Sequence, residues 1–314
     1  MSGMHPVSKI VTGTLGAGAA CLAWATLVER HLYAVRRFAV PVLPQGSRPL
    51  RILHVSDLHL VRGQERRIDW VRGLAGLEPD FVVNTGDNMS DLDVAPDVLR
   101  AMRPLMEFPG AFVLGSNDYF GPTPKNPGRY FTAPNHRRIE LRSVELRWQD
   151  LVHGFTSGGW IDLDNARRRV VVDGRELELV GVDDPHLRYD RYAEVSAPAA
   201  REAALTIGVT HAPYQRVLDA MAADGARLLL AGHTHGGQLC VPLYGALVTN
   251  CDLDRGRVKG LSRWWPGADG APSSAAPADA AYLEVSAGLG HSKYAPARFA
   301  CRPEATLLTL TAAS

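Results

Sequence analysis

The stretch RILHVSDLHL, residues 51–60, decides the fold. Its first half is a short apolar run of the kind that forms a buried strand. Its second half places Asp57 and His59 directly after that run. Alternate residues of an extended chain point the same way, so both side chains can reach one cation. The same order, a buried strand followed by residues that ligate metals, recurs further along the chain.

Four more apolar runs, over residues 81–84, 111–114, 204–210 and 227–231, lead into short polar motifs. These motifs read Gly86-Asp87-Asn88, Gly115-Ser116-Asn117-Asp118, Thr210-His211-Ala212-Pro213 and Gly232-His233-Thr234-His235-Gly236-Gly237-Gln238. Sheets of α/β proteins place their active sites at the carboxyl ends of strands. We therefore expect the five strand ends to converge on one site.

The residue types in these motifs indicate a metal site. Imidazoles combined with carboxylates suit Mn, Zn or Fe better than Ca or Mg. The i, i+2 reasoning used for Asp57 and His59 applies equally to His233 and His235, and a carboxylate such as Asp87 can bridge two cations. A lone Asp-x-His, a Gly-Asp-Asn turn or a loop histidine is more often structural. The ordered set of five motifs is what predicts the metal site.

The rest of the chain predicts an α/β fold, because short apolar runs alternate with stretches of helical periodicity. Helices are expected over residues 68–77 and 97–106, and a hairpin around Asp173-Gly174. Further strands are expected over residues 281–286 and 306–310. Residues 50–314 are expected to form a single catalytic domain.

The formal net charge of +1, with arginines spread along the chain, gives no reason to expect a nucleic-acid partner. The four cysteines show no CxxC spacing and are interpreted as free thiols, although pairing of Cys240 with Cys251 across a loop stays open.

Residues 10–28, IVTGTLGAGAACLAWATLV, carry no charge and are long enough to form a transmembrane helix. A single-pass membrane anchor is the preferred interpretation, with a cleaved export signal and a buried helix as alternatives. Residues 1–9 would be a short tail and residues 29–49 a basic linker. Because Arg30, Arg36 and Arg37 follow the apolar run, the catalytic domain is expected on the cytoplasmic side, with export as the alternative.

With these motifs assembled, residues 51–310 resemble the calcineurin-like metallophosphoesterase superfamily, whose motifs read DxH, GDx, GN[HD], H and GHxH. The resemblance is closest to the membrane-associated bacterial branch typified by the YaeI and YkuE phosphodiesterases, on the segments HVSDLHL, NTGDN, THAP and GHTHGGQ. It implies a four-layer α/β/β/α sandwich with a binuclear metal site at the strand ends.

The resemblance also implies the ligands and the reaction. One cation would be held by Asp57, His59, Asp87 and His235, and the other by Asp87, Asn117, His211 and His233. Two divalent ions (Mn, Zn or Fe) would hydrolyse phosphoesters through a metal-bridging hydroxide. The catalytic residues would be Asp87, Asn117, Asp118 and His211.

The third motif departs from the family. Gly115-Ser116-Asn117-Asp118 stands where the family commonly has Gly-Asn-His-Asp. Either Asn117 becomes the ligand through a one-residue local shift, or Ser116 or water takes its place. The histidine that the family uses to protonate the leaving group is missing, because an amide is not a general acid. Asp118, His186 and His291 are the candidate substitutes.

The leading hypothesis is a phosphodiesterase that acts on a lipid-linked or membrane-proximal substrate, similar to enzymes that hydrolyse UDP-2,3-diacylglucosamine. The alternatives are a nucleotide or cyclic-nucleotide phosphodiesterase and a metal-binding regulatory protein without turnover. Weaker candidates for substrate contacts are Asn88, Asp184, His186 and Arg298. The aromatic insert over residues 121–160 is either a lid for an acyl chain or part of the core.

Overall fold

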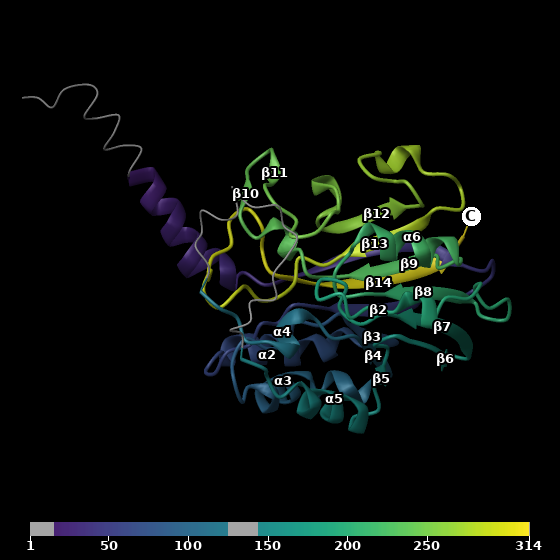
Figure 1. Ribbon diagram of the computed structural model, residues 1–314, viewed down its shortest axis with the longest axis horizontal. Coiled ribbons are helices and arrows are strands. Elements are labelled where there is room, and N and C mark those ends of the chain that lie inside the picture. The colour runs from purple at the N-terminus through teal and green to yellow at the C-terminus, as the bar shows by residue number, and fades with distance from the viewer. Residues whose placement is uncertain (1–15, 125–143, 314) are drawn as a thin grey trace, which may run out of the picture.

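Figure 1 shows a computed structural model of the chain, which describes residues 16–124 and 144–313. Two six-stranded sheets form its centre. The first sheet has the order β1 (Ala34–Leu43), β14 (Glu304–Ala312), β2 (Leu50–Val55), β3 (Phe81–Asn84), β4 (Gly110–Phe112) and β5 (Ile161–Asp162). The second has the order β12 (Gly260–Trp264), β13 (Ala281–Val285), β9 (Leu228–Ala231), β8 (Leu205–Val209), β7 (Arg175–Gly181) and β6 (Ala166–Val172). A small ribbon pairs β10 (Cys240–Val241) with β11 (Gly245–Ala246).

Helices cover the outer faces of both sheets. The α-helices are α2 (Glu65–Gly73), α3 (Ala95–Met102), α4 (Ser116–Tyr119), α5 (Trp148–Ser157) and α6 (Gln215–Ala223). The short helical turns are η1 (Trp24–Val28), η2 (Glu29–His31), η3 (Leu74–Leu77), η4 (Leu105–Glu107), η6 (Tyr192–Glu194), η7 (His235–Gly237), η8 (Arg255–Arg257) and η9 (Ser273–Ala275). In Figure 1, α2, α3 and α5 lie together below the first sheet, and α6 lies beside β8 and β9 of the second.

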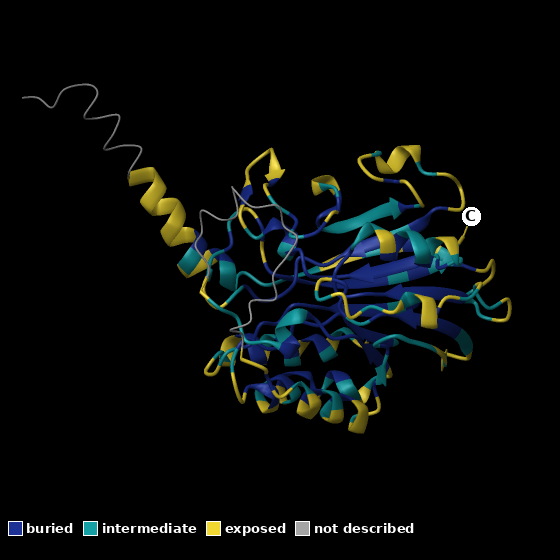
Figure 2. Cartoon of the chain, in the orientation of Figure 1, coloured by how far each residue is buried: buried dark blue, intermediate teal, exposed yellow. Residues whose placement is uncertain are grey.

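Three apolar clusters lie between these layers. Val82 packs toward α2, α3 and α5, whereas its neighbour Val83 packs toward Ile207 of the second sheet. Leu229 faces the other way, toward Leu218 of α6. Strands buried on both faces have continuous apolar runs, and this is the pattern of the central strands (Figure 2). The predicted α/β fold is therefore confirmed, with the layers ordered helix, sheet, sheet, helix.

The hairpin around Asp173-Gly174 is also confirmed. Strands β6 and β7 pair antiparallel out to Val172 and Arg175, and the two turn residues between them have φ of 48° and 74°. Positive φ at both central residues is what a two-residue hairpin turn requires, and Asp-Gly is a preferred sequence for it.

Residues 29–49 do not form a simple linker. They contain β1, which lies at the edge of the first sheet and pairs in parallel with β14. The side chains of Val40 and Leu43 are buried between the sheets, whereas Arg36 and Arg37 of β1 are exposed. The basic composition hid this strand, because an edge strand tolerates charges, and a proline such as Pro41, that a central strand does not.

The first described residues, 16–23, form a helix that is exposed along its length. Residues 10–15 of the predicted transmembrane segment lie outside the described residues. Within the described ranges, no helix is long and apolar enough to cross a bilayer.

The aromatic insert is only partly described, because Tyr130 and Phe131 fall outside the described ranges. Phe155 packs in the core between Phe112 and Trp160. For Phe155 and Trp160 the lid interpretation is wrong. All four cysteines are free, so Cys240 and Cys251 are not paired.

Candidate metal centre

The loops that follow β2, β3, β4, β8 and β9 meet at one edge of the sandwich. Backbone amides tie the first two together, since Asp57 N donates to Gly86 O and His59 N donates to Asp87 O, both at 2.9 Å. The two sheets are joined where His233 N donates to the carboxylate of Asp57, 3.0 Å from Oδ2. The expected convergence of strand ends is therefore present in the structure.

The first group of candidate ligands contains Asp57, His59, Asp87 and His235, whose donor atoms all lie within 4.8 Å of one another. His59 Nε2 lies 3.0 Å from His235 Nε2 and 3.3 Å from Oδ2 of Asp87. Separations near 3 Å between donors are those found around a single cation with bonds of about 2.1 Å. All four side chains are buried or nearly so.

The second group contains Asp87, His211 and His233. His211 Nε2 lies 3.4 Å from Oδ1 of Asp87 and 3.3 Å from Nδ1 of His233. Asp87 therefore belongs to both groups, with one oxygen toward each. His233 and His235 fall in different groups, so the i, i+2 expectation that they share a cation is wrong.

Asn117 lies beside Asp87, the residue that both groups share. Its backbone N–H donates to Oδ1 of Asp87 at 2.7 Å, and its side-chain amide donates to Oδ2 at 2.8 Å. Ser116 Oγ lies 3.4 Å from the same amide nitrogen. Of the two residues considered at this position, Asn117 is the one in contact with the shared carboxylate.

The backbone at these positions is unusual. Asp57, His59, Asp87, His233 and His235 all have φ between 43° and 68°, the left-handed region. Such non-glycine residues each cost on the order of 1–3 kcal/mol and concentrate at functional sites. The prediction that Asp57 and His59 converge because the chain is extended is thus wrong in its reason, since both lie in sharp bends beyond β2.

Two glycines leave space for the candidate ligands. A Cβ on Gly115 would lie 2.3 Å from Oδ1 of Asp87 and 2.7 Å from the ring of His211. A Cβ on Gly232 would lie 2.0 Å from Ser56 Oγ and 2.5 Å from Oδ2 of Asp57. Only glycine lets these loops approach the carboxylates so closely.

The outer ring nitrogens of three histidines are held by oxygen atoms. His59 Nδ1 lies 2.8 Å from Ser90 Oγ, His211 Nδ1 lies 2.6 Å from Thr85 O, and His233 Nε2 lies 3.2 Å from Asn250 O. The other nitrogen of each ring then faces the carboxylates. Metal-binding histidines are typically oriented in this way.

Burial and charge set the protonation of the centre. Burial lowers the pKa of His233 and His235 well below the usual range, which favours the neutral imidazole that metals bind. Burial alone would raise the pKa of Asp87, but the adjacent His211 outweighs it and holds that pKa well below normal. The residues present therefore fit divalent cations in donor type and spacing.

A family model supports this interpretation of the centre. Residues 50–237 match the model described as calcineurin-like phosphoesterase. The chain belongs to this family. It is accordingly a hydrolase that acts on phosphoester bonds, and the predicted family resemblance is confirmed.

Three bacterial relatives match almost the whole phosphoesterase chain. The uncharacterized protein YpbG of Bacillus subtilis is 27% identical over 97% of this chain and 98% of its own length. The uncharacterized metallophosphoesterase YkuE of the same organism is 25% identical over 96% and 95%. The phosphodiesterase YaeI of Escherichia coli is 28% identical over 90% of each chain.

Asp118 of the phosphoesterase is fully buried and ties two loops together. Its carboxylate accepts backbone N–H groups of Asp87 at 2.8 Å, Asn88 at 2.8 Å and Gly115 at 3.0 Å. Burial raises its pKa to about 6, and the charge of Asp87 adds to this effect. The structure thus places Asp118 behind the candidate ligands, where it positions the loop that carries Asp87.

The four residues predicted to contact substrate differ in how far they are buried. Asn88, Asp184 and Arg298 are fully buried. Arg298 donates to the carbonyl groups of Ala287 and Gly290, both at 2.6 Å. His186 alone is exposed, and its ring centroid lies 4.7 Å from that of His233. Of the four, His186 is therefore the one that is both exposed and adjacent to a candidate ligand.

Several residues of the phosphoesterase that hydrogen-bond the candidate ligands could not be recognised from the sequence. Ser90 orients His59 although the two are 31 positions apart. Ser56 donates to Oδ2 of Asp57 at 2.6 Å, and Thr85 donates to Ser56 at 2.6 Å. Serine and threonine next to a ligand motif are too common for spacing to single these out.

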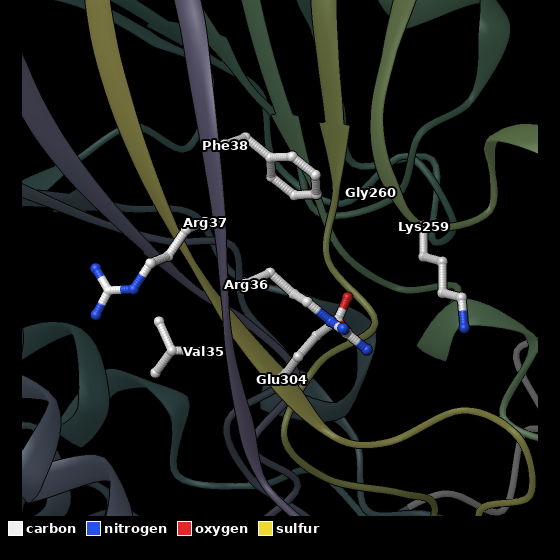
Figure 3. A pocket seen from close by; sticks show the side chains of 7 residues that line it. All are labelled: Val35, Arg36, Arg37, Phe38, Lys259, Gly260 and Glu304. Carbon is white, nitrogen blue, oxygen red and sulfur yellow. The ribbon is translucent and has the colours of Figure 1, made fainter.

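A separate hollow of about 520 Å³ lies along the edge strand β1 of the phosphoesterase (Figure 3). Its lining residues are Val35, Arg36, Arg37, Phe38, Lys259, Gly260 and Glu304. None of them belongs to the candidate ligand groups. Glu304 forms an ion pair with Arg36 at 2.8 Å, so the lining keeps an excess of positive charge from Arg37 and Lys259.

Proposed function

We propose that this protein is a phosphodiesterase that uses two divalent cations held by the two ligand groups. The observation that carries the proposal is the position of Asp87, whose two carboxylate oxygens face different groups. Asp57, His59 and His235 would complete one cation site, and His211, His233 and Asn117 the other. Manganese, zinc and iron are the candidates, because the donors are imidazole nitrogens and oxygens.

When bound, a pair of cations in such a site lowers the pKa of water and neutralises charge on phosphoryl oxygens. The protein's own residues orient the candidate ligands and set their protonation. His211 is fixed through Nδ1 by the carbonyl of Thr85, which presents Nε2 to the centre. Asp87 raises the pKa of His211 although burial opposes it, so loading the site with metal should release a proton.

We assign the leaving-group contact to His186. Family members commonly have a histidine where this chain has Asn117, and an amide cannot supply a proton. His186 is exposed beside His233, on the loop after β7, and its Nδ1 lies 3.1 Å from the hydroxyl of Tyr214. The other two candidates, Asp118 and His291, are both buried.

A lipid-linked or membrane-proximal phosphodiester is the proposed substrate class. Leu22, Trp24 and Leu27 are exposed on the N-terminal helical segment. In the hollow beside β1, Lys259 lies on the same side of the strand as Arg36, whose charge is paired with Glu304 (Figure 3). Exposed apolar side chains on a helix are the kind of surface that inserts at a bilayer interface. The name of YaeI, a phosphodiesterase, supports the diester half of the proposal.

A substrate panel on the Mn²⁺-loaded protein tests the proposal. The panel contains bis-p-nitrophenyl phosphate, p-nitrophenyl phosphate, 3′,5′-cyclic AMP and UDP-2,3-diacylglucosamine in detergent. We expect the diesters to be hydrolysed faster than the monoester, and the acylated diester faster than cyclic AMP. Preference for cyclic AMP would favour the nucleotide alternative. Metal binding with no hydrolysis of any substrate would favour a regulatory protein.

A further inference from the structure

The apolar layer between the two sheets contains a buried polar cluster. His54 of β2, Thr306 of β14 and Glu284 of β13 are all fully buried. His54 Nδ1 forms a short contact with Oε2 of Glu284, and Thr306 donates to Oε1 of the same carboxylate at 2.8 Å. The cluster therefore links the two sheets at a place where apolar residues such as Ile52 and Leu308 otherwise fill the space.

A chain of hydrogen bonds leads from this cluster to the candidate metal centre. His54 Nε2 lies 2.8 Å from Thr85 Oγ1, and Thr85 donates to Ser56 at 2.6 Å. Ser56 in turn donates to Oδ2 of Asp57 at 2.6 Å. All of these side chains are fully buried, so water does not compete for the bonds.

The residues at the two ends of this series of hydrogen bonds decide which atom donates in each bond. Because Thr85 gives its proton to Ser56, its oxygen must accept one, and the only ring atom in reach is Nε2 of His54. Nε2 must then carry a proton. Nδ1, on the other side of the ring, contacts the carboxylate of Glu284.

The last hydrogen bond of this series, from Ser56 to Asp57, sets how the carboxylate of Asp57 faces the centre. Oδ2 accepts from Ser56 at 2.6 Å, and the backbone N–H of His233 is shared between Oδ2 at 3.0 Å and Oδ1 at 3.2 Å. Oδ1 is the oxygen nearest the Nε2 atoms of His59, at 3.9 Å, and His235, at 3.7 Å. The side-chain hydrogen bond from Ser56 therefore holds Oδ2 and leaves Oδ1 as the oxygen nearer the candidate ligands.

We propose that Glu284 and His54 are positioning residues of the centre, which act through Thr85 and Ser56 to hold Oδ1 of Asp57 toward the first cation. This inference rests on the proposed function, because it assumes that Asp57 ligates metal. Stability alone does not explain the cluster, since replacing a buried ion pair by well-packed apolar residues is often neutral or stabilising.

Thr85→Val tests the chain without leaving a buried charge unpaired. The protein has a matched control in Thr206, a buried threonine of β8 that also donates to a carboxylate, that of Glu178, at 2.8 Å. Thr85→Ser keeps the hydroxyl and serves as the rescue variant. A second variant, His54→Phe/Glu284→Leu, removes both partners of the buried contact together. Calorimetric titration of each metal-free protein with Mn²⁺ measures affinity without turnover, and thermal unfolding checks the fold.

We expect Thr85→Val and the double variant to weaken one class of Mn²⁺ sites by about 10- to 100-fold, the loss typical when a partner of a metal ligand is removed. Thr85→Ser and Thr206→Val should bind as the wild type does. Folded Thr85→Val with wild-type Mn²⁺ affinity would overturn the inference, as would an equal loss in Thr206→Val. If the wild type binds Mn²⁺ but hydrolyses no phosphoester, the proposed function fails, and the affinity of Thr85→Val still decides this inference.

Discussion

Asp87 is the residue on which both candidate ligand groups depend. Its carboxylate is almost completely buried, yet His211 and His59 keep its pKa low, so it stays ionised. An ionised carboxylate enclosed by imidazoles is costly unless a cation or proton compensates for it. The proton on His211 serves that purpose in the metal-free protein, and we propose that a divalent cation replaces it.

His186 gives a prediction about leaving groups. If it protonates or hydrogen-bonds the departing oxygen, His186→Asn should lower kcat/KM by about 100-fold for a phenyl phosphodiester, whose leaving group is poor. The loss for bis-p-nitrophenyl phosphate should be much smaller, because that leaving group needs little assistance. His153→Asn, at an exposed histidine of α5, is the control. Equal losses on both substrates would contradict the assignment.

Asp184 gives a prediction about pH. Burial raises its pKa to about 7, and the charge of Asp87 adds to the effect while His211 opposes it. The folded protein then binds more protons than the unfolded chain between about pH 4 and pH 7, so this group's contribution to stability falls as pH rises through that window. Asp184→Asn removes the contribution. In EDTA, the Tm of the variant relative to wild type should therefore increase from pH 4 to pH 8, and a difference that does not change with pH would exclude the raised pKa.

At the scale of elements, the site consists of loops held together by their backbones. The loop after β2 donates to the loop after β3, and Asp118 of α4 accepts amides from the loop that carries Asp87. The close approach of these loops depends on glycine at Gly115 and Gly232. The elements thus fix the ligands before any cation binds.

Gly115→Ala should disrupt the centre more than the fold. The backbone of Gly115 has a negative φ that alanine accepts, so the cost comes from a Cβ 2.3 Å from Oδ1 of Asp87. We expect Mn²⁺ affinity and kcat each to fall by at least about 10-fold. Gly73→Ala is the matched control, because a Cβ there meets nothing within 4 Å. Wild-type metal binding by Gly115→Ala would show that the loops can move apart.

The sequence predicted the strands that carry the motifs, because buried parallel strands have continuous apolar runs that end at polar loops. It missed β1, whose basic residues fit an edge strand and a linker equally well. It could not predict that Asp57 and His59 adopt left-handed conformations, since that bend is imposed by hydrogen bonds to the next loop. The contact of His54 with Glu284 spans 230 positions and depends on how the two sheets stack.

At the scale of the whole molecule, β1 closes one edge of the first sheet. It pairs with β14 along most of its length, and it buries Val40 and Leu43 between the sheets. β14 also pairs with β2, the strand that leads to Asp57 and His59. The segment before residue 50 therefore supports the strand that presents the first ligands.

Removing the segment that contains β1 tests whether it stabilises the first sheet. A chain that begins at residue 44 should lose about 3–6 kcal/mol of unfolding free energy, from the two lost side chains alone. It should also aggregate more readily, because β14 becomes an unprotected edge. A chain that begins at residue 29 keeps β1 and should unfold like the full-length protein. Urea denaturation of both compares them directly, and equal midpoints would mean that β1 is dispensable.

The central claim is that two cations share Asp87, and metal counting in Asp87→Asn tests it most directly. Asp219→Asn is the control, because Asp219 accepts a bond from Trp264 beside α6 and lies in neither ligand group. After loading with Mn²⁺ and gel filtration, we expect two ions per chain in the wild type and in Asp219→Asn. Asp87→Asn should retain at most one ion and lose at least about 100-fold in hydrolysis of bis-p-nitrophenyl phosphate. Two tightly bound ions and wild-type activity in Asp87→Asn would contradict the account.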